Sequence, residues 1–300
     1  MSIWLISSIN ILTGVLVLFF GGELFVQGSV ALALILGIPQ LVIGLTVVSV
    51  GTSSPELFVS VSSVIRGSET LAASNVVGSN IFNLLVVLGS SAIILPLKVE
   101  SRLIRRDVPL LLTISAAVWG MASSGRITWQ SGLALLIALI INTLWEIRTI
   151  REEPSELKDS DSKIEKGNYS INLFKAGLKL IFGIALLTLG SNLLVQGATT
   201  AARLLDVSEA VIGLTIVSVG TSMPELVTSL VAALKGRTDL AIGNVVGSNL
   251  LNQLLVLSTT AIFAGNNGLK IDRILINRDF PVMILATLAL IPIFWSNGRI

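Results

Sequence analysis

Apolar residues form long runs along this chain, and polar residues interrupt the runs at only a few positions. Runs near or above the roughly 20 residues that cross a bilayer core predict membrane-spanning helices. Short strands of alternating apolar and polar residues, the pattern of a membrane β-barrel, are absent from the sequence. We therefore predict an all-α polytopic membrane protein with nine spans, at about 3–33, 39–66, 70–95, 107–123, 128–148, 173–203, 208–235, 239–264 and 279–296.

Three stretches of the first half recur in the second half in the same order, which indicates a duplication. LFFGGELFVQG and LTLGSNLLVQG begin at Leu18 and Leu187, a separation of 169 residues. VIGLTVVSVGTSSPEL and VIGLTIVSVGTSMPEL, which begin at Val42 and Val211, keep this separation, as do SNVVGSNIFN and GNVVGSNLLN. Glycines within the first and sixth spans indicate either close contact with a neighbouring helix or positions that simply face lipid, and both roles stay open.

The first copy contains five predicted spans, an odd number, so the second copy enters the membrane in the opposite orientation. This inverted-topology arrangement is typical of secondary transporters, whose binding site lies near the membrane midplane between the copies. We divide the chain into a first repeat at 1–150, a linker at 151–170 and a second repeat at 171–300. The linker is polar and charged, with too little apolar content to fold alone.

Positive charges predict how the chain is oriented in the membrane. With the N-terminus outside, 14 of the 20 lysines and arginines fall on the cytoplasmic side and 6 on the outer side. Cytoplasmic loops of membrane proteins carry such an excess. We therefore expect a multi-pass protein of the plasma (inner) membrane with a cytoplasmic linker. The second repeat lacks a counterpart of the fifth span, so we expect a tenth helix to be missing through truncation.

A glutamate lies within an apolar span of each repeat, in the motifs GTSSPE and GTSMPE. A carboxylate at membrane depth costs about 2.5–3.5 kcal/mol, so Glu56 and Glu225 need a reason to be there. Pro55 and its counterpart Pro224 have no N–H to donate, so each helix must open at its motif. Hydroxyls and freed carbonyls then surround each carboxylate. Because oxygen is the only ligand atom available, the motifs favour hard cations such as Ca²⁺, Mg²⁺ or Na⁺.

A polar stripe follows each motif on the next span. Asn75, Ser79 and Asn83 are four residues apart and share one helix face, and the second repeat carries the same stripe. Polar side chains also hold helices together in membrane bundles. Both roles, a place in the site or contact between helices, stay open for Asn75, Asn80, Asn244 and Asn249. For Asn83 and Asn252 we favour the site, since each follows a serine by one turn.

Two ionised carboxylates in one pocket carry a charge of about −2, and an empty pocket would leave that buried charge unpaired. One Ca²⁺ or a set of Na⁺ ions neutralises it, so the carrier crosses the membrane loaded with one ion or the other. This pattern predicts antiport. The alternatives are a structural Glu pair that shares a proton and a cation channel, although channel filters are usually rings around a symmetry axis. Without Cys, His or a paired nucleophile and base, we do not expect an enzyme.

The duplicated GTSxPE and NVVGSN motifs resemble the repeats of the cation/Ca²⁺ antiporter (CaCA) superfamily, in particular its prokaryotic Na⁺/Ca²⁺ exchangers. The resemblance implies ten helices in two inverted halves of five and exchange of Na⁺ for Ca²⁺ by alternating access. It also implies that the first and sixth helices slide across a core of the second, third, seventh and eighth. The implied ion ligands are Glu56, Glu225, Thr52, Thr221, Ser49, Ser53, Ser218, Ser222, Ser79, Ser248, Asn83 and Asn252. Of these, the two threonines act through their backbone carbonyls, and Ser49 and Ser218 also act through the backbone.

The coupling ion is less firmly implied. Some prokaryotic members and the K⁺-dependent branch carry Asp at the position of Asn252, so this site lacks a third carboxylate and K⁺ co-transport is not expected. H⁺-coupled members typically have another motif in place of GTSxPE, and the chain has no histidine. A H⁺-coupled exchanger of Ca²⁺ or another divalent cation at the same site is the alternative. We expect no cofactor beyond the transported ions Ca²⁺ and Na⁺, no nucleic-acid partner, and a monomer in contact with the lipid bilayer.

Overall fold

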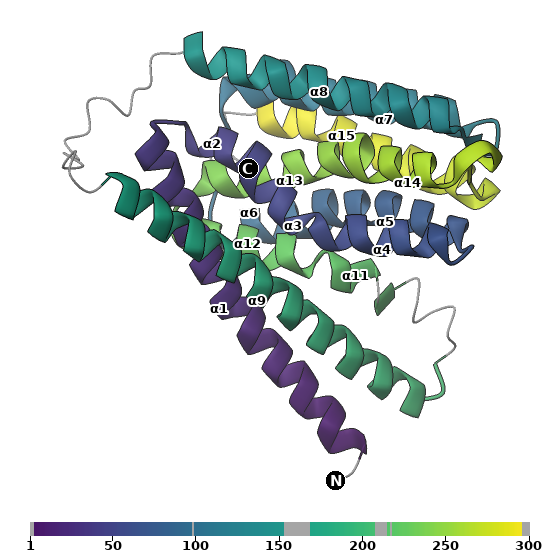
Figure 1. The fold of residues 1–300 in the computed structure, drawn as a ribbon, viewed down its shortest axis with the longest axis horizontal. Coiled ribbons are helices and arrows are strands. Elements are labelled where there is room, and N and C mark those ends of the chain that lie inside the picture. The colour runs from purple at the N-terminus through teal and green to yellow at the C-terminus, as the bar shows by residue number, and fades with distance from the viewer. Residues whose placement is uncertain (1–2, 98, 153–168, 208–214, 217, 296–300) are drawn as a thin grey trace.

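The structure is a computed structural model that describes residues 3–97, 99–152, 169–207, 215–216 and 218–295. Nearly all of this part of the chain is helical (Figure 1). The first repeat contains α1 (Ile3–Leu36), α2 (Gln40–Ile43), η1 (Gly44–Val48), α3 (Ser49–Thr52), α4 (Ser54–Ile65), α5 (Glu69–Phe82), η2 (Asn83–Val87), α6 (Leu88–Ile94), η3 (Leu103–Asp107), α7 (Val108–Ala122), β1 (Arg126–Ile127) and α8 (Trp129–Glu152). The second repeat contains α9 (Tyr169–Leu204), α11 (Ser218–Thr221), α12 (Met223–Leu234), α13 (Thr238–Leu251), η7 (Asn252–Leu257), α14 (Ser258–Phe263), η8 (Gly265–Asn267), β2 (Leu269–Lys270), η9 (Leu275–Asp279) and α15 (Phe280–Trp295).

The predicted all-α polytopic fold is confirmed. Within the described residues, six helices are long and apolar enough to cross a membrane, or up to seven if the bent pair at 40–52 and 54–65 is one span. Helices lie in all nine predicted ranges, the shorter ones including α7 and α12. Most of the predicted linker, part of the seventh span (208–214 and 217) and the last residues (296–300) lie outside the described residues.

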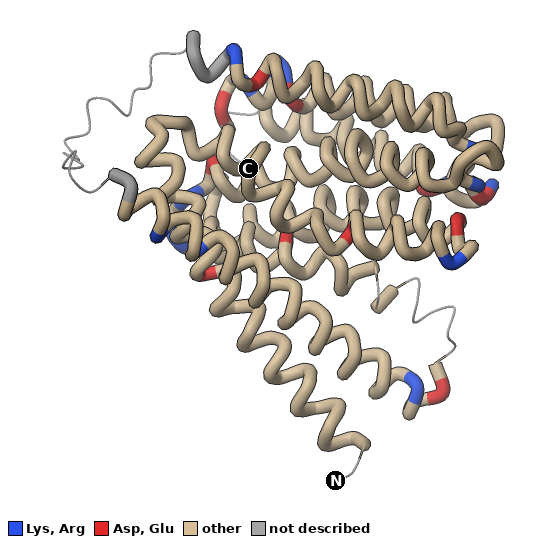
Figure 2. The backbone as a smooth tube through the Cα atoms, viewed as in Figure 1, with Lys and Arg blue, Asp and Glu red and all other residues tan. Residues whose placement is uncertain are grey.

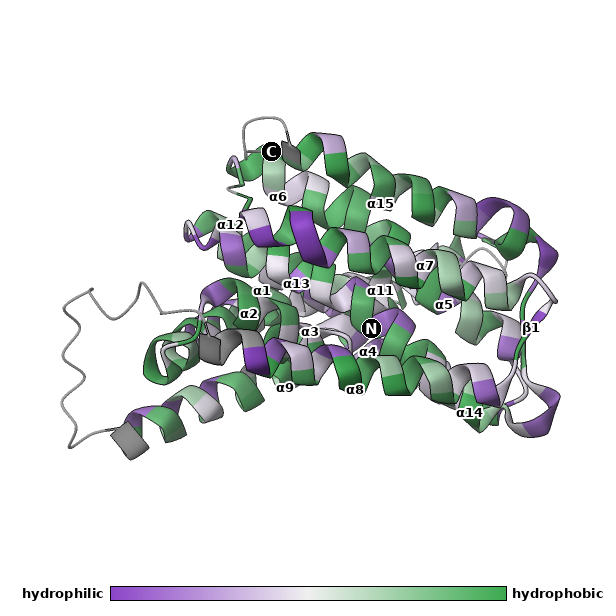
Figure 3. Ribbon diagram, turned by 90° about the horizontal axis from the view of Figure 1, so that it is seen from above, coloured by the Kyte–Doolittle hydropathy of each residue, from purple (hydrophilic) through white to green (hydrophobic). Residues whose placement is uncertain are grey.

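Apolar side chains cover the outside of the bundle. Phe20 in α1 is 60% exposed, Ile141 in α8 is 59% exposed and Phe174 in α9 is 67% exposed. Figure 3 shows hydrophobic residues along these helices, with hydrophilic residues concentrated toward the ends of the bundle. An apolar surface this extensive is what a lipid-facing helix bundle presents.

The helices α1 and α9 run antiparallel beside each other and extend away from the rest of the bundle (Figure 1). A Cβ atom at Gly14 would lie 2.7 Å from the backbone nitrogen of Leu194, and one at Gly28 would lie 3.0 Å from that of Leu180. Any larger residue would push the two helices apart, so glycine is required for this contact. Of the two roles left open for these glycines, the structure supports close contact between helices, here between the first and sixth spans.

The helix α13 forms the centre of the bundle. It belongs to the span Thr238–Phe263, and 94% of the most apolar 18-residue stretch of that span is buried inside the bundle. It packs against α12, against the first broken helix at η1 and α3, and crosses α5. At that crossing Asn80 Nδ2 donates to the carbonyl of Asn249, and Asn249 Nδ2 donates to the carbonyl of Asn80, both at 3.3 Å. Asn80 and Asn249 occupy the same position in the two repeats, so each bonds to its own counterpart. Such a contact is expected where two inverted repeats meet about a pseudo-two-fold axis.

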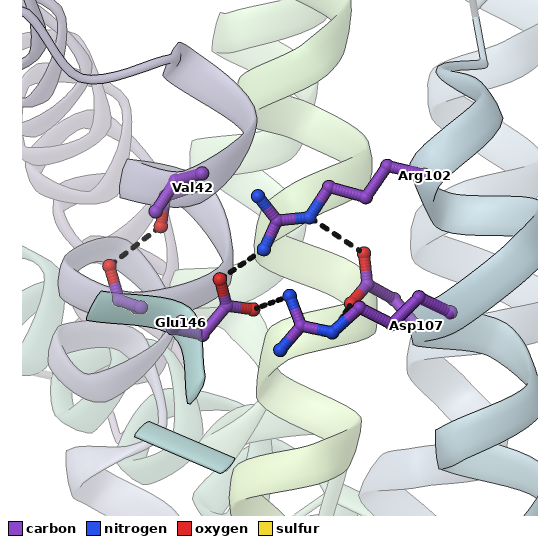
Figure 4. A network of polar contacts seen from close by, with 6 residues as sticks. Val42, Arg102, Asp107 and Glu146 are labelled. Atoms are coloured by element: carbon purple, nitrogen blue, oxygen red, sulfur yellow. Dashed lines mark hydrogen bonds and ion pairs between the residues drawn. The ribbon is translucent and has the colours of Figure 1, made fainter. Parts of the chain in front are cut away.

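Polar contacts tie the bundle together at both ends. At one end β1 and β2 pair antiparallel, with Arg126 opposite Lys270. At the opposite end Glu146 of α8 forms ion pairs with Arg102 and Arg106, the second at 3.2 Å (Figure 4). The Nε atom of Arg102 also lies 3.7 Å from Asp107 Oδ2. This ion cluster attaches α8 to the π-helical segment η3 at the start of α7.

Candidate functional site

Each GTSxPE motif forms a break between two helices. In the first repeat α3 ends at Thr52, and Ser53 leaves the helical conformation (φ −81°, ψ 4°) before α4 begins. Ser222 has nearly the same backbone conformation (φ −89°, ψ 7°) before α12. Pro55 and Pro224 lie in the first turns of α4 and α12, where a missing N–H costs no helical hydrogen bond. The predicted opening is present in both repeats, with a bend of 42° in the first.

These breaks place Glu56 and Glu225 in the first turns of α4 and α12. Both side chains are fully buried, at 0% exposure. The two carboxylates lie close enough to repel each other electrostatically. Each also lies at the positive end of its own helix, which favours a negative charge there. The structure thus brings together the two glutamates that the motifs predicted as a pair.

Each carboxylate accepts a hydrogen bond from the serine of the other repeat. Ser222 Oγ donates to Glu56 Oε1 at 3.0 Å, and Ser53 Oγ donates to Glu225 Oε1 at 3.1 Å. The sequence placed each serine near the glutamate of its own motif, and this crossed pairing could not be read from it. The second oxygen of each carboxylate, Oε2, has no hydrogen-bond partner among the described residues.

Two asparagines of the polar stripes fix the threonines of the opposite repeat. Asn244 Oδ1 accepts from Thr52 Oγ1 at 3.0 Å, while Asn244 Nδ2 donates to Ser229 Oγ at 2.9 Å. Equivalent bonds, at 3.2 and 3.0 Å, join Asn75 to Thr221 and Ser60. Of the two roles left open for these asparagines, the structure supports contact between helices. Ser60 and Ser229 were missed, although a serine four residues after each glutamate was a visible signal.

The asparagines Asn83 and Asn252 each begin a π-helical segment, η2 and η7. Such segments are often found at functional sites, because the wider turn displaces backbone and side chains from the regular ladder. Asn252 Nδ2 donates to Asn80 Oδ1 at 3.1 Å, but Asn252 Oδ1 and both amide atoms of Asn83 lack partners in the described part of the chain. The same is true of Ser79 Oγ, whereas Ser248 Oγ lies 3.3 Å from Thr52 Oγ1.

Several buried oxygen atoms in this pocket have no hydrogen-bond partner in the described chain and are therefore available as ligands. Buried polar atoms are normally hydrogen-bonded, and leaving one unpaired is costly. Among the described residues the exceptions at this site are Glu56 Oε2, Glu225 Oε2, Ser79 Oγ, Asn83 Oδ1 and Asn252 Oδ1. A donor set of carboxylate, hydroxyl and amide oxygens fits hard cations as substrates. No group of three or more acidic, His or Cys residues occurs in the described chain, so two carboxylates set the charge.

The predicted serines Ser49 and Ser218 have different surroundings. Ser49 is fully buried, and its hydroxyl lies 2.6 Å from the carbonyl of Gly44 and 3.0 Å from that of Asn244. Ser218 instead lines a cavity of about 720 Å³, to which Gly78 also contributes. The far wall of the cavity is formed by the turn that leads into η9, at the end of the bundle where β1 and β2 lie. Of the predicted ion ligands, only Ser218 lines this cavity.

The sequence matches the family described as "Sodium/calcium exchanger protein" over residues 6–148 and 175–299. The chain belongs to this family. It is 36% identical to CaxA of Alkalimonas amylolytica over 99% of this chain and 92% of that protein. It is 30% identical to the sodium/calcium exchanger MaX1 of Methanosarcina acetivorans over 96% of this chain and 91% of that one. The fold matches a structure of the sodium-calcium exchanger NCX_Mj with a TM-score of 0.83 at 30% identity, covering 98% of this chain and 92% of the other.

Family membership confirms the resemblance to prokaryotic exchangers of the CaCA superfamily. The protein is a multi-pass membrane antiporter of cations and Ca²⁺, and its family is one of transporters rather than of enzymes. The structural match also agrees with the inverted-repeat fold predicted from the duplication.

Proposed function

We propose that the protein exchanges Na⁺ for Ca²⁺ by alternating access, with both ions bound in turn at the pocket of Glu56 and Glu225. The observation that carries the proposal is the pair of buried carboxylate oxygens, one on each glutamate, that lack hydrogen-bond partners in the described chain. A bound Ca²⁺ would satisfy both and neutralise the charge. The names of the relative MaX1 and of the structural match NCX_Mj, both sodium–calcium exchangers, support Na⁺ as the coupling ion.

The proposed ligands follow the two-fold arrangement of the site. Ca²⁺ would take the carboxylates and the backbone carbonyls of Thr52 and Thr221, whose hydroxyls are already bonded to asparagines. Na⁺ ions would add serine oxygens. These ligands are the hydroxyls of Ser53, Ser79, Ser222 and Ser248 and the backbone at Ser49 and Ser218, with Asn83 and Asn252 at the central position.

The charge of the pocket accounts for coupling. When the site is empty, its two buried carboxylates repel each other and their charge is unpaired. The conformational change that exposes the empty site at the opposite end is therefore strongly disfavoured. Either Ca²⁺ or Na⁺ removes that repulsion and lets the loaded site become exposed at the opposite end. The open space beside Gly78 at the cavity and the close contact of its counterpart Gly247 support an assignment of this structure to one of two such states.

The test is ⁴⁵Ca²⁺ uptake into Na⁺-loaded proteoliposomes diluted into Na⁺-free buffer with a proton ionophore present. We expect uptake that requires internal Na⁺ and is abolished by Glu56→Gln or Glu225→Gln, because each change removes one charge from the pocket. Uptake that does not depend on internal Na⁺, and that is driven by an imposed pH gradient when the ionophore is left out, would instead indicate the H⁺-coupled alternative. Wild-type uptake in the two glutamine variants would overturn the site itself.

We further propose that the N-terminus lies outside, that the linker is cytoplasmic, and that the protein works as a monomer. The positive-inside charge pattern supports the orientation. The chain contains no cysteine, so single cysteines can be introduced without background. A membrane-impermeant maleimide should label a cysteine at Arg66 from outside and one at Arg237 only after the cells are opened.

A further inference from the structure

A second hollow lies at the end of the bundle opposite the cavity described above, where α1 and α9 meet the turn between α12 and α13. It has a volume of about 320 Å³ and is lined by three cationic side chains, Lys179, Lys235 and Arg237. Figure 2 shows lysines and arginines gathered in this region, near the start of α9. None of the proposed ion ligands lines this hollow, and its cations exclude a role in cation binding.

Polar side chains of α1 hold the two lysines at the wall of the hollow. Lys179 Nζ donates to Gln27 Oε1 at 3.0 Å, and Gln27 Nε2 donates to Glu23 Oε1 at 2.7 Å. Lys235 forms an ion pair with the same Glu23. One carboxylate and one neutral amide thus position two ammonium groups, and Arg237 adds a third cation from the neighbouring turn. The cations exceed the single carboxylate in this chain of contacts, as an anion-binding site requires.

The remaining wall of the hollow is apolar and leads to the outer surface of α1. Val26 is buried at 1% exposure, Val30 is partly buried, and Leu34 is 41% exposed. A cationic pocket beside a lipid-facing apolar track matches the two parts of a phospholipid, its phosphate and its acyl chains.

The cations of this hollow do not follow the duplication, unlike the ion site. The positions in the first repeat that correspond to Lys179 and Arg237 are Asn10 and Ser68, and only Lys235 has a charged counterpart, Arg66. A general excess of positive charge at one side of a membrane protein explains how many cations this end carries. It does not explain why three of them surround a hollow with an apolar wall.

We propose that this hollow binds the phosphate group of an anionic phospholipid, whose acyl chains lie along Val30 and Leu34 of α1. The phosphate would bridge Lys179 of α9 to Lys235 and Arg237 of the core. This inference rests on the proposed function and on the sliding of the first and sixth helices, α1 and α9, that the family resemblance implies. Such a bridge would stabilise the arrangement seen here and make exchange depend on anionic lipid.

Binding is tested on the purified full chain by titration with phosphatidylglycerol or phosphatidylcholine, followed by native mass spectrometry. Wild-type protein should prefer phosphatidylglycerol. Lys179→Gln and Arg237→Gln should each weaken that binding about fivefold, the effect of removing one cation near a lipid phosphate. Arg237→Lys, which keeps the charge, should retain most of it. Arg66→Gln, the repeat counterpart at the other end, should bind as wild type does.

Three results would overturn the proposal. The first is wild-type phosphatidylglycerol binding in the double variant Lys179→Gln with Arg237→Gln, and the second is equal binding of the two lipids. The third is complete competition by inorganic phosphate, since the site would then take a free anion rather than a lipid. Glu56→Gln should bind phosphatidylglycerol normally, so failure of the exchange proposal and failure of this one remain distinguishable.

Discussion

The serine that faces each carboxylate comes from the opposite repeat, so the two halves of the site are chemically interdependent. Ser222→Ala removes the hydrogen bond to Glu56, and a bond to a charged group contributes about 1.5–3 kcal/mol. We expect the apparent Ca²⁺ affinity, measured from the concentration dependence of uptake, to fall at least about tenfold. Ser53→Ala should have a matching effect through Glu225.

Ser54 provides the control for that experiment. It neighbours Ser53, but its side chain is exposed and donates to the carbonyl of Val50 in α3, across the helix break and away from both carboxylates. Ser54→Ala should leave Ca²⁺ affinity unchanged. An equal loss in all three variants would mean that the effect comes from disturbing the helix break and not from the carboxylates.

Asn252 and its counterpart Asn83 differ in one contact, which makes their Asp variants informative. Asn252 Nδ2 donates to Asn80 Oδ1, a bond that an aspartate loses, while no partner of Asn83 is present in the described chain. Asn252→Asp places a third carboxylate in the pocket and a charge against the Asn80 carbonyl. We expect a changed ion preference or coupling, measured as Na⁺-dependent against Na⁺-independent Ca²⁺ flux. Identical ratios in wild type and variant would remove Asn252 from the site.

At the residue scale the sequence predicted the glutamates, but not the partners that hold them. Glu56 and Glu225 could be found because a carboxylate within an apolar run is energetically costly and usually has a functional role. Whether Ser53 turns to its own glutamate or to that of the other repeat depends on how two broken helices cross. Periodicity within one span carries no information about that crossing.

The ion cluster between η3 and α8 shows how an element at the edge of the bundle is fixed. Glu146 is 5% exposed and pairs with Arg102 and Arg106 (Figure 4). The guanidinium of Arg106 also lies 4.5 Å from the centre of the Trp145 ring. Glu146→Gln leaves two largely buried cations poorly compensated. Loss of one partner from a buried ion pair costs about 3–5 kcal/mol, and some relief by solvent at this end brings our expectation to about 3.

This loss should appear as a lower unfolding temperature of the purified protein in detergent. Arg148→Gln is the control, since Arg148 is exposed on the same helix and no ion pair is seen for it within the described residues. Equal melting of wild type and Glu146→Gln would mean that α8 is held by apolar packing alone.

At the element scale the spans and the helix breaks were predictable, whereas the π-helical segments were not. Long apolar runs predict the spans, and the prolines at 55 and 224 predict the helix breaks. The segments that begin at Asn83 and Asn252 insert one extra residue into a helical turn, and no residue type in NLLVV or NQLLVL signals it. What the structure adds is their surroundings: η2 lies against α12 and α13, and η7 lies against α4 and α5, each from the other repeat.

At the scale of the whole molecule, two inverted halves with nearly identical motifs adopt unequal packing. Gly247 of α13 lies against η1, where an added Cβ would be 2.6 Å from the carbonyl oxygen of Leu45. Its counterpart Gly78 borders the cavity, and an added Cβ there would meet no atom within 4 Å. One interface is closed and its counterpart is open. Exchanging these two environments would produce the other state of an alternating-access cycle.

This asymmetry predicts that the same substitution acts oppositely at the two glycines. Gly247→Ala cannot be accommodated while η1 packs on α13, so it should shift the population away from the present state. A cysteine at Thr70, which lines the cavity, should then react more slowly with a maleimide than it does in the unsubstituted background. Gly78→Ala fits the present state and would clash only in the other, so the same cysteine should react as fast or faster.

Both alanine variants should slow Na⁺-dependent Ca²⁺ uptake, because each disfavours one of the two states that every cycle must visit. Opposite changes in labelling together with parallel losses of transport are the signature of two alternating packings. If both variants changed labelling in the same direction, the glycines would act as separate packing sites and the two ends would not be linked. Uptake at the wild-type rate in Gly247→Ala would show that the closed contact at Leu45 need not form during exchange.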